Sequence, residues 1–290
     1  MEENQVQVRQ QNGVAKKKPS STEFFLDLVS KQADIEKTPL TEKEISYAVG
    51  IIANANRKIN DLKITWNDVD FMGCQLPQQI KRFARLGMSI EENDIFIDIR
   101  NHKDSNLKDI NIKKQYQGIE KEIMRFCSKN VVRFYRDVIC EGDDFKMQTD
   151  FATGLQKIVN HEYAEDVDRN KLENIIGAYE IAYVEEDGKL NQYIGYVDKN
   201  RIMRAYNASA SREKTVWKLD TRLMVLKTAT WVLYNNVMKP YMQVPTELLD
   251  DWKATQDEMD FDNEQPKPQF HKPDIKAIDI DDIEINATSK

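Results

Sequence analysis

The chain has 290 residues, of which 40% are hydrophobic and 31% are charged. This is the composition of a charge-rich globular protein that is long enough to bury one large core or two small ones. It argues against a membrane protein, because no apolar stretch approaches the about 20 residues that cross a bilayer.

Scattered cysteines and a polar N-terminus both favour a cytoplasmic protein. The three cysteines form no C-x-x-C pair, which argues against a disulfide framework or a zinc ribbon. Residues 1–19 lack the apolar core of a secretion signal. The three histidines are also scattered, so a His-rich metal site is not expected.

The net charge of −7 is concentrated at the C-terminus. Residues 250–290 contain 12 acidic and 5 basic residues, and the other 249 residues hold 37 of each sign. A neutral body still binds nucleic acid where its bases cluster. We expect a flexible arm over 1–22, a folded core over 23–249 and an acidic, flexible tail over 250–290. The arm is either a plain disordered start or a segment that touches DNA.

Three helices are predicted in the first third of the chain. The pair Ser21–Thr22 is a candidate N-cap for the first helix. Thr41 with Glu44 forms a capping-box pattern that opens a second helix. The third is expected over Gln75–Leu86, because Gly87 stops it.

The clearest amphipathic helix is predicted over residues 112–128, after a short alternating strand over 95–100. Apolar residues share one side of this helix, and three cations with one glycine share the other. These four residues are Lys114, Gly118, Lys121 and Arg125. They form either an ordinary solvated face or a surface that a phosphate backbone approaches closely beside the glycine.

Several strands are predicted in the middle of the chain. In the first, over 131–139, Arg133 and Tyr135 lie on one face, which places a cation beside a ring that can stack on a base. Further strands are expected over 145–151, 174–184 and 190–197. An Asp-Gly hairpin turn joins the last two.

Two more helices are predicted after the strands. Asp198 opens a short one that carries Arg201 and Arg204 on one face. The second, over Trp217–Met238, is apolar on all sides and is therefore expected to be buried, in the core or against another subunit. Pro240 ends it.

Motifs for nucleotide hydrolysis and for common hydrolases are missing from the sequence. There is no G-x-x-x-x-G-K-[ST], no G-x-S-x-G and no H-E-x-x-H, which argues against an ATPase motor. The adjacent carboxylates Asp143 and Asp144 suit either a Mg²⁺ contact or a simple turn. No cofactor is required by the sequence.

Several segments between about residues 75 and 250 resemble, in order, the motifs of one protein family. They are Gln79–Gly87, Gln115–Gly118, Val138–Phe145, Ile176–Tyr183 with Tyr193, Arg204, and Trp217, Met224, Lys227 and Thr228. Together they resemble the RecT family of phage recombinases, which are single-strand annealing proteins that work without ATP.

The resemblance implies an α+β fold in which helices pack on a curved antiparallel sheet. It implies subunits that join into rings or helical filaments along DNA. The implied function is to coat single-stranded DNA and to anneal complementary strands into duplex, without ATP, in the recombination of phage or prophage DNA inside the bacterial host cell.

An annealing protein must hold the sugar-phosphate backbone and leave the base edges free to pair. We therefore expect a cationic groove that runs across subunits. Its candidate residues are Arg100, Lys114, Gly118, Lys121, Arg125, Arg133, Tyr135, Arg201, Arg204 and, from the family motif, Lys227. The residues assigned to packing, in the core or between subunits, are Trp217, Met224 and Trp231.

Two other classes of protein stay open. One is a Mg²⁺-dependent nuclease that uses Asp143, Asp144 and Asp150, and the other is a capsid or scaffold protein that self-assembles without DNA. The tail has its own alternatives, since residues 274–285 alternate isoleucine with acids, as a short docking segment does. One hypothesis is that the tail competes with DNA for the basic groove, and another is that it docks a partner such as an exonuclease or a host single-strand-binding protein. The third is that it only improves solubility.

Overall fold

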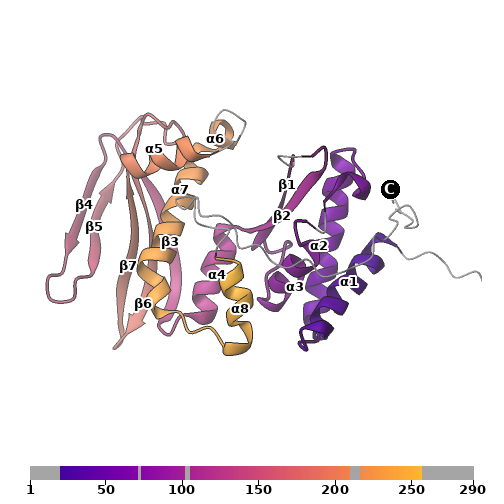
Figure 1. Ribbon diagram of the computed structural model, residues 1–290. Helices are drawn as coiled ribbons and strands as arrows, with labels where there is room; N and C mark the ends of the chain where they lie inside the picture. The colour runs from indigo at the N-terminus through magenta and orange to yellow at the C-terminus, as the bar shows by residue number, and fades with distance from the viewer. Residues whose placement is uncertain (1–19, 71–72, 102–104, 210–215, 257–290) are drawn as a thin grey trace, which may run out of the picture.

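The computed structural model describes residues 20–70, 73–101, 105–209 and 216–256 and shows an α+β protein (Figure 1). Its sheets are small and antiparallel, which confirms the α+β class predicted from the sequence. In Figure 1 the N-terminal helices lie on one side of the molecule, the larger sheet lies on the other, and α8 lies between them. Among the described helices, none is long and apolar enough to cross a membrane.

The described residues form eight α-helices, seven strands and three short helical segments of other types. The α-helices are α1 (Ser21–Ile35), α2 (Glu42–Asp61), α3 (Leu76–Arg85), α4 (Tyr116–Phe126), α5 (Lys199–Ala208), α6 (Val216–Leu219), α7 (Thr221–Val232) and α8 (Thr246–Ala254). The strands are β1 (Ile95–Asn101), β2 (Lys108–Lys114), β3 (Asn130–Cys140), β4 (Asp144–Thr149), β5 (Gln156–Glu162), β6 (Ile175–Glu186) and β7 (Lys189–Asp198). The other segments are the 3₁₀ turns η1 (Trp66–Asp68) and η3 (Lys239–Tyr241) and the π-helical η2 (Leu233–Met238).

Capping side chains set where the first helices begin. Ser20 caps α1, one residue before the predicted cap, and forms a capping box with Glu23. The capping box predicted at Thr41 is confirmed at the start of α2. Gly87 follows α3 with a φ of 68°, a left-handed conformation that suits glycine and ends the helix where the sequence predicted.

The predicted start of the helix over 112–128 is wrong, because these residues begin as β2. That strand pairs with β1, and α4 starts only at Tyr116. The side-chain amide of Gln79 holds the outer edge of β2: its Nε2 donates to the Ile110 carbonyl at 3.3 Å, and its Oε1 accepts from the Ile112 N–H at 2.7 Å. A contact from α3, distant in sequence, therefore favours strand over helix here.

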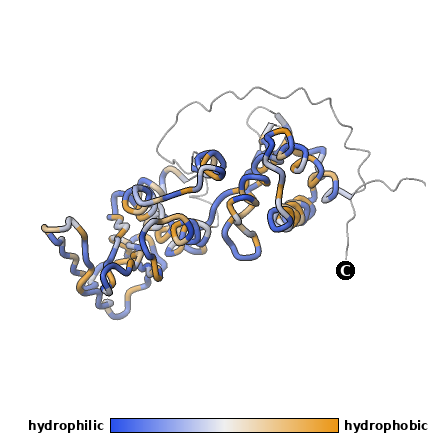
Figure 2. Tube along the Cα trace, turned by 90° about the horizontal axis from the view of Figure 1, so that it is seen from below, coloured by the Kyte–Doolittle hydropathy of each residue, from blue (hydrophilic) through white to orange (hydrophobic). Residues whose placement is uncertain are grey.

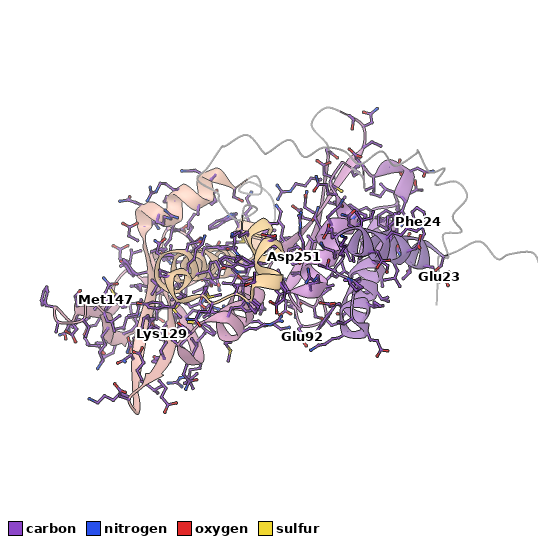
Figure 3. All side chains as sticks on the ribbon, turned by 60° about the horizontal axis from the view of Figure 1, so that its bottom comes forward. Glu23, Phe24, Glu92, Lys129, Met147 and Asp251 are labelled. Carbon is purple, nitrogen blue, oxygen red and sulfur yellow. The ribbon has the colours of Figure 1, made fainter. Side chains whose placement is uncertain are left out.

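The larger sheet has the strand order β3–β6–β7. The predicted hairpin between its last two strands is confirmed. Asp187 and Gly188 have φ of 51° and 70°, and a type I′ turn requires positive φ at both of its central residues. The separate pair β4–β5 forms an arm at the outer side of this sheet (Figure 1). Met147 on β4 lies toward the far end of the arm (Figure 3).

The single helix expected over Trp217–Met238 is broken at Asp220. This residue leaves helical geometry with a φ of −146°, and its side chain caps α7 by accepting from the N–H of Leu223 at 3.1 Å. The chain then continues through α7 and η2 and stops at η3, which contains Pro240 as predicted.

The helix α8 crosses the predicted boundary between core and tail at residue 249. Trp252 is only 9% exposed and Asp251 only 6%, so the folded core extends beyond that boundary. The Asp251 carboxylate pairs with Arg85 on α3 at 2.8 Å, at the junction between α8 and the N-terminal helices (Figure 3). Residues 1–19 of the expected arm and 257–290 of the expected tail lie outside the described residues.

The buried apolar side chains gather in two main clusters. The first joins α1–α4, the β1–β2 pair, part of the large sheet and α8, and the second lies between that sheet and α5–α7. Apolar and polar residues alternate along the chain in Figure 2, as expected for elements that bury one face. The second cluster fixes the helices that form the candidate site.

Candidate nucleic-acid interface

A groove of about 160 Å³ lies between α5, α6 and α7. Among the described residues that line it, the charged ones are Arg201, Arg204 and Lys227, and none is a carboxylate. Apolar, hydroxyl and amide side chains complete the described lining: Ala205, Ala208, Ser209, Trp217, Met224, Thr228, Trp231, Val232, Asn235 and Asn236. The described lining of the groove therefore combines cations with aromatic surface.

Helical spacing places these groups on facing sides. Asp198 caps α5 by accepting from the Arg201 N–H at 2.7 Å, and Ile202 on the same helix is fully buried. One turn separates Arg201 from Arg204, so both cations lie on one side of α5. On α7 the lining residues Lys227 and Thr228 lie three and four residues after Met224, and Trp231 follows them by four and three, which puts all of them on one helical face.

Two indole rings form the apolar part of the groove. Trp217 is 3% exposed, and its ring stands edge-on to that of Tyr206 at 5.2 Å. Its Nε1 is buried and has no hydrogen-bond partner among the described residues. Trp231 is half-buried and contacts the ring of Tyr234 at 6.4 Å. The groove therefore contains a buried donor that lacks an acceptor.

Lys227 is a partly buried cation in this groove. Burial lowers the pKa of its ammonium group, and the more distant Asp220 offsets this only in part. The ammonium forms no hydrogen bond or ion pair with another described residue. A bound anion would favour the charged form of Lys227 and supply the missing partner.

Two of the predicted contact residues lie inside the protein. Lys114, the last residue of β2, is buried, and its ammonium pairs with the buried Glu122 at 2.5 Å. Gly118 packs against the backbone of Asp94, where a side chain would meet the carbonyl oxygen at 2.2 Å. The close approach inferred from this glycine is to the protein's own chain, so we leave Lys114 and Gly118 out of the candidate interface.

Lys121 and Arg125 line a second hollow, of about 330 Å³, between α2, α3 and α4. Lys121 pairs with Glu92 at 2.5 Å and Asp94 at 2.6 Å; although burial opposes the charge, these partners raise its pKa (Glu92 is labelled in Figure 3). Arg125 donates to the Leu86 carbonyl at 2.5 Å. Sequence reasoning missed Lys43 and Arg85, which share the hollow because α2 and α3 fold against α4.

The remaining predicted residues lie on strands. Arg100 pairs with Asp98 at 2.6 Å within β1. Arg133 stacks over the Tyr183 ring, 4.6 Å from its centre, and Tyr135 is 46% exposed nearby on β3. The structure thus brings Arg201, Arg204 and Lys227 together in one groove and distributes the other candidates over separate surfaces.

The three acids considered for Mg²⁺ do not form one site. Asp143 is buried and accepts from Arg169 at 2.8 Å and from His161 at 3.0 Å; although burial alone would raise its pKa, these and backbone donors hold it well below the usual range. Asp144 binds Lys146 at 3.0 Å, and Asp150 caps its own loop. Among the described residues, no group of three potential ligands gathers in metal-binding geometry.

No family model matches the chain, and no curated protein matches it.

Proposed function

We propose that the protein binds single-stranded DNA and anneals complementary strands without ATP. The single observation that carries the proposal is the groove between α5 and α7, where the described lining residues include three cations and two indole rings but no carboxylate. Cations beside aromatic surfaces are the combination that single-strand binding uses. The motif resemblance to annealing recombinases agrees with it, and several of the residues that carry the resemblance line this groove.

The chemistry of the groove suits a contact to the DNA backbone. Arg201, Arg204 and Lys227 attract phosphates whatever the base sequence, so they supply affinity without reading it. The Trp231 ring can support a sugar or the face of one base, which leaves Watson–Crick edges available for pairing. Contacts of this kind are weak singly, so we propose that several copies act together along a strand.

Annealing of two complementary labelled oligonucleotides without ATP tests the proposal. Arg204→Glu should weaken single-strand binding about tenfold or more at low salt, because a lost charged contact is worth on the order of 1.5–3 kcal/mol. The matched control is Lys189→Glu, which makes the same charge change at the exposed β6–β7 turn.

Salt dependence separates the outcomes. Loss of a phosphate contact should also flatten the dependence of affinity on salt concentration. Equal affinity and equal salt dependence in Arg204→Glu and Lys189→Glu would remove the groove from DNA binding. Shortened strands in the presence of Mg²⁺ would contradict annealing and point to a nuclease.

A further inference from the structure

One sequence feature has chemistry that matches the groove and no role in the proposed function. Residues 274–285 contain five acids, five isoleucines and one lysine. Acids and isoleucines alternate over residues 278–281 and again over 282–285, and the phase shifts by one residue between these stretches, so an extended chain presents both chemistries on each side. Two chemistries, anionic and aliphatic, are therefore combined in one short peptide.

The groove presents the complementary pair of chemistries. Its charged lining is cationic, and its apolar lining is provided by Trp217, Met224 and Trp231. The buried Nε1 of Trp217 has no acceptor, and the Lys227 ammonium has no partner among the described residues. A peptide carbonyl or a carboxylate would supply an acceptor for these donors, while isoleucines would cover the half-buried ring of Trp231.

The path of the chain allows the two to meet. Gln256, the last described residue, donates to Glu122 at 3.2 Å, and Glu122 also accepts from Tyr234 in η2. The next residues of η2, Asn235 and Asn236, line the groove. The point where the tail leaves the core is therefore linked through Glu122 to η2, which also contributes to the groove. The intervening residues 257–273 reach roughly 55 Å when extended.

We propose that residues 274–285 dock into the groove between α5 and α7 of the same chain and exclude DNA from it. The acids pair with Arg201, Arg204 and Lys227, and the isoleucines cover the half-buried ring of Trp231. The docking depends on the groove alone, and its regulatory consequence rests on the proposed function. Neutralising the segment would then open the groove for a DNA strand.

The first measurement needs no DNA. Lys227 is labelled with a limiting amount of an acylating reagent in the full-length protein, and its modification is quantified by mass spectrometry. The test variant carries Asp279→Asn, Asp281→Asn, Asp282→Asn and Glu284→Gln. The matched control removes four charges elsewhere in the tail: Asp257→Asn, Glu258→Gln, Asp260→Asn and Asp262→Asn.

Labelling of Lys227 should rise roughly threefold in the test variant, because a site covered two-thirds of the time reacts at one-third of the free rate. It should stay at the wild-type level in the control variant. Ile278→Ser with Ile280→Ser should also raise labelling, since the apolar half of the contact is lost. Equal labelling in all four proteins would overturn the docking.

Dilution and DNA binding complete the test. Labelling should be unchanged by about a hundredfold dilution, because a contact within one chain does not depend on protein concentration. A strong concentration dependence would overturn docking within one chain. Single-strand affinity should rise by the same factor as labelling in the test variant. Changed labelling without any DNA binding would retain the docking and reject the proposed function.

Discussion

The carboxyl group of Glu180 on β6 is fully buried between the large sheet and α7. Burial raises its pKa to about 8; the nearby charge of Glu120 adds to the rise, and the Thr230 hydroxyl and Arg136 oppose it. Its Oε1 has no hydrogen-bond partner in the described part of the chain. Glu180 is therefore protonated in the folded protein over a pH range in which an ordinary glutamate is charged.

Glu180→Gln should flatten the pH dependence of the free energy of unfolding. The folded protein holds this proton more tightly than the unfolded chain, so stability falls as the pH rises from the ordinary value of 4.5 to about 8. The amide cannot titrate, and the variant should gain stability relative to wild type toward the upper end. Urea unfolding of both proteins at several pH values in this range measures the difference in the free energy of unfolding. The control is Glu141→Gln, at an exposed site. If the free energy of unfolding of both variants follows the wild-type pH dependence, Glu180 does not cause that dependence.

At this scale the sequence identified the cations but not their surroundings. Lys114 and Lys227 look alike in the chain, yet Lys114 is paired with buried Glu122, whereas Lys227 has no described partner. Glu122 lies eight residues from Lys114, across the end of β2, so helical periodicity gave no sign of the pair. The face of α7 that lines the groove was readable, because Met224, Lys227 and Trp231 recur at helical spacing.

The arm formed by β4 and β5 is held to the large sheet by a polar network around Asp143. Its carboxylate binds Arg169 and His161, and His161 Nδ1 lies 2.8 Å from the Tyr179 hydroxyl on β6. A small apolar cluster beneath the arm includes Phe145 and Ile158. The network therefore positions an element that contributes little to the main core.

Asp143→Asn should loosen the arm without unfolding the rest of the protein. The neutral amide leaves Arg169 without its charged partner, which costs about 3 kcal/mol, at the lower end for a broken buried pair. Limited proteolysis should therefore cut the exposed loop 150–155 faster than in wild type. The control is Asp144→Asn, whose side chain is exposed. Equal cleavage of both variants would show that Asp143 does not hold the arm.

Elements with local signals were predicted, and elements decided by distant contacts were not. The capping box at Thr41 and the Asp187–Gly188 turn are each determined by residues that are close together in the sequence. By contrast, β2 depends on Gln79 from α3, and the break at Asp220 interrupts a continuous apolar pattern. Helix α8 was missed because its buried face is short and lies within an acidic stretch.

At the scale of the whole molecule, α8 contacts both the N-terminal helices and the rest of the chain. Asp251 on this helix pairs with Arg85 and approaches Lys81 at 3.7 Å, both on α3. Trp252 donates to Glu122 of α4 at 2.5 Å. Glu122 also accepts from Lys114 of β2 and from Tyr234 of η2, so one buried carboxylate on α4 contacts three other elements.

Truncation tests whether this closure stabilises the fold. A chain ending at residue 249 loses Asp251 and Trp252, and loss of a buried tryptophan side chain alone costs about 3–5 kcal/mol. It also leaves Lys81 and Glu122 with fewer partners, which adds to the cost. A chain ending at residue 256 keeps these contacts and should match the full-length protein within about 1 kcal/mol. Urea unfolding followed by circular dichroism measures both, and similar stability of the two truncated chains would show that α8 is dispensable. The chain that ends at residue 256 is therefore the one suited to DNA-binding measurements, because it lacks the acidic residues 257–290 and keeps α8.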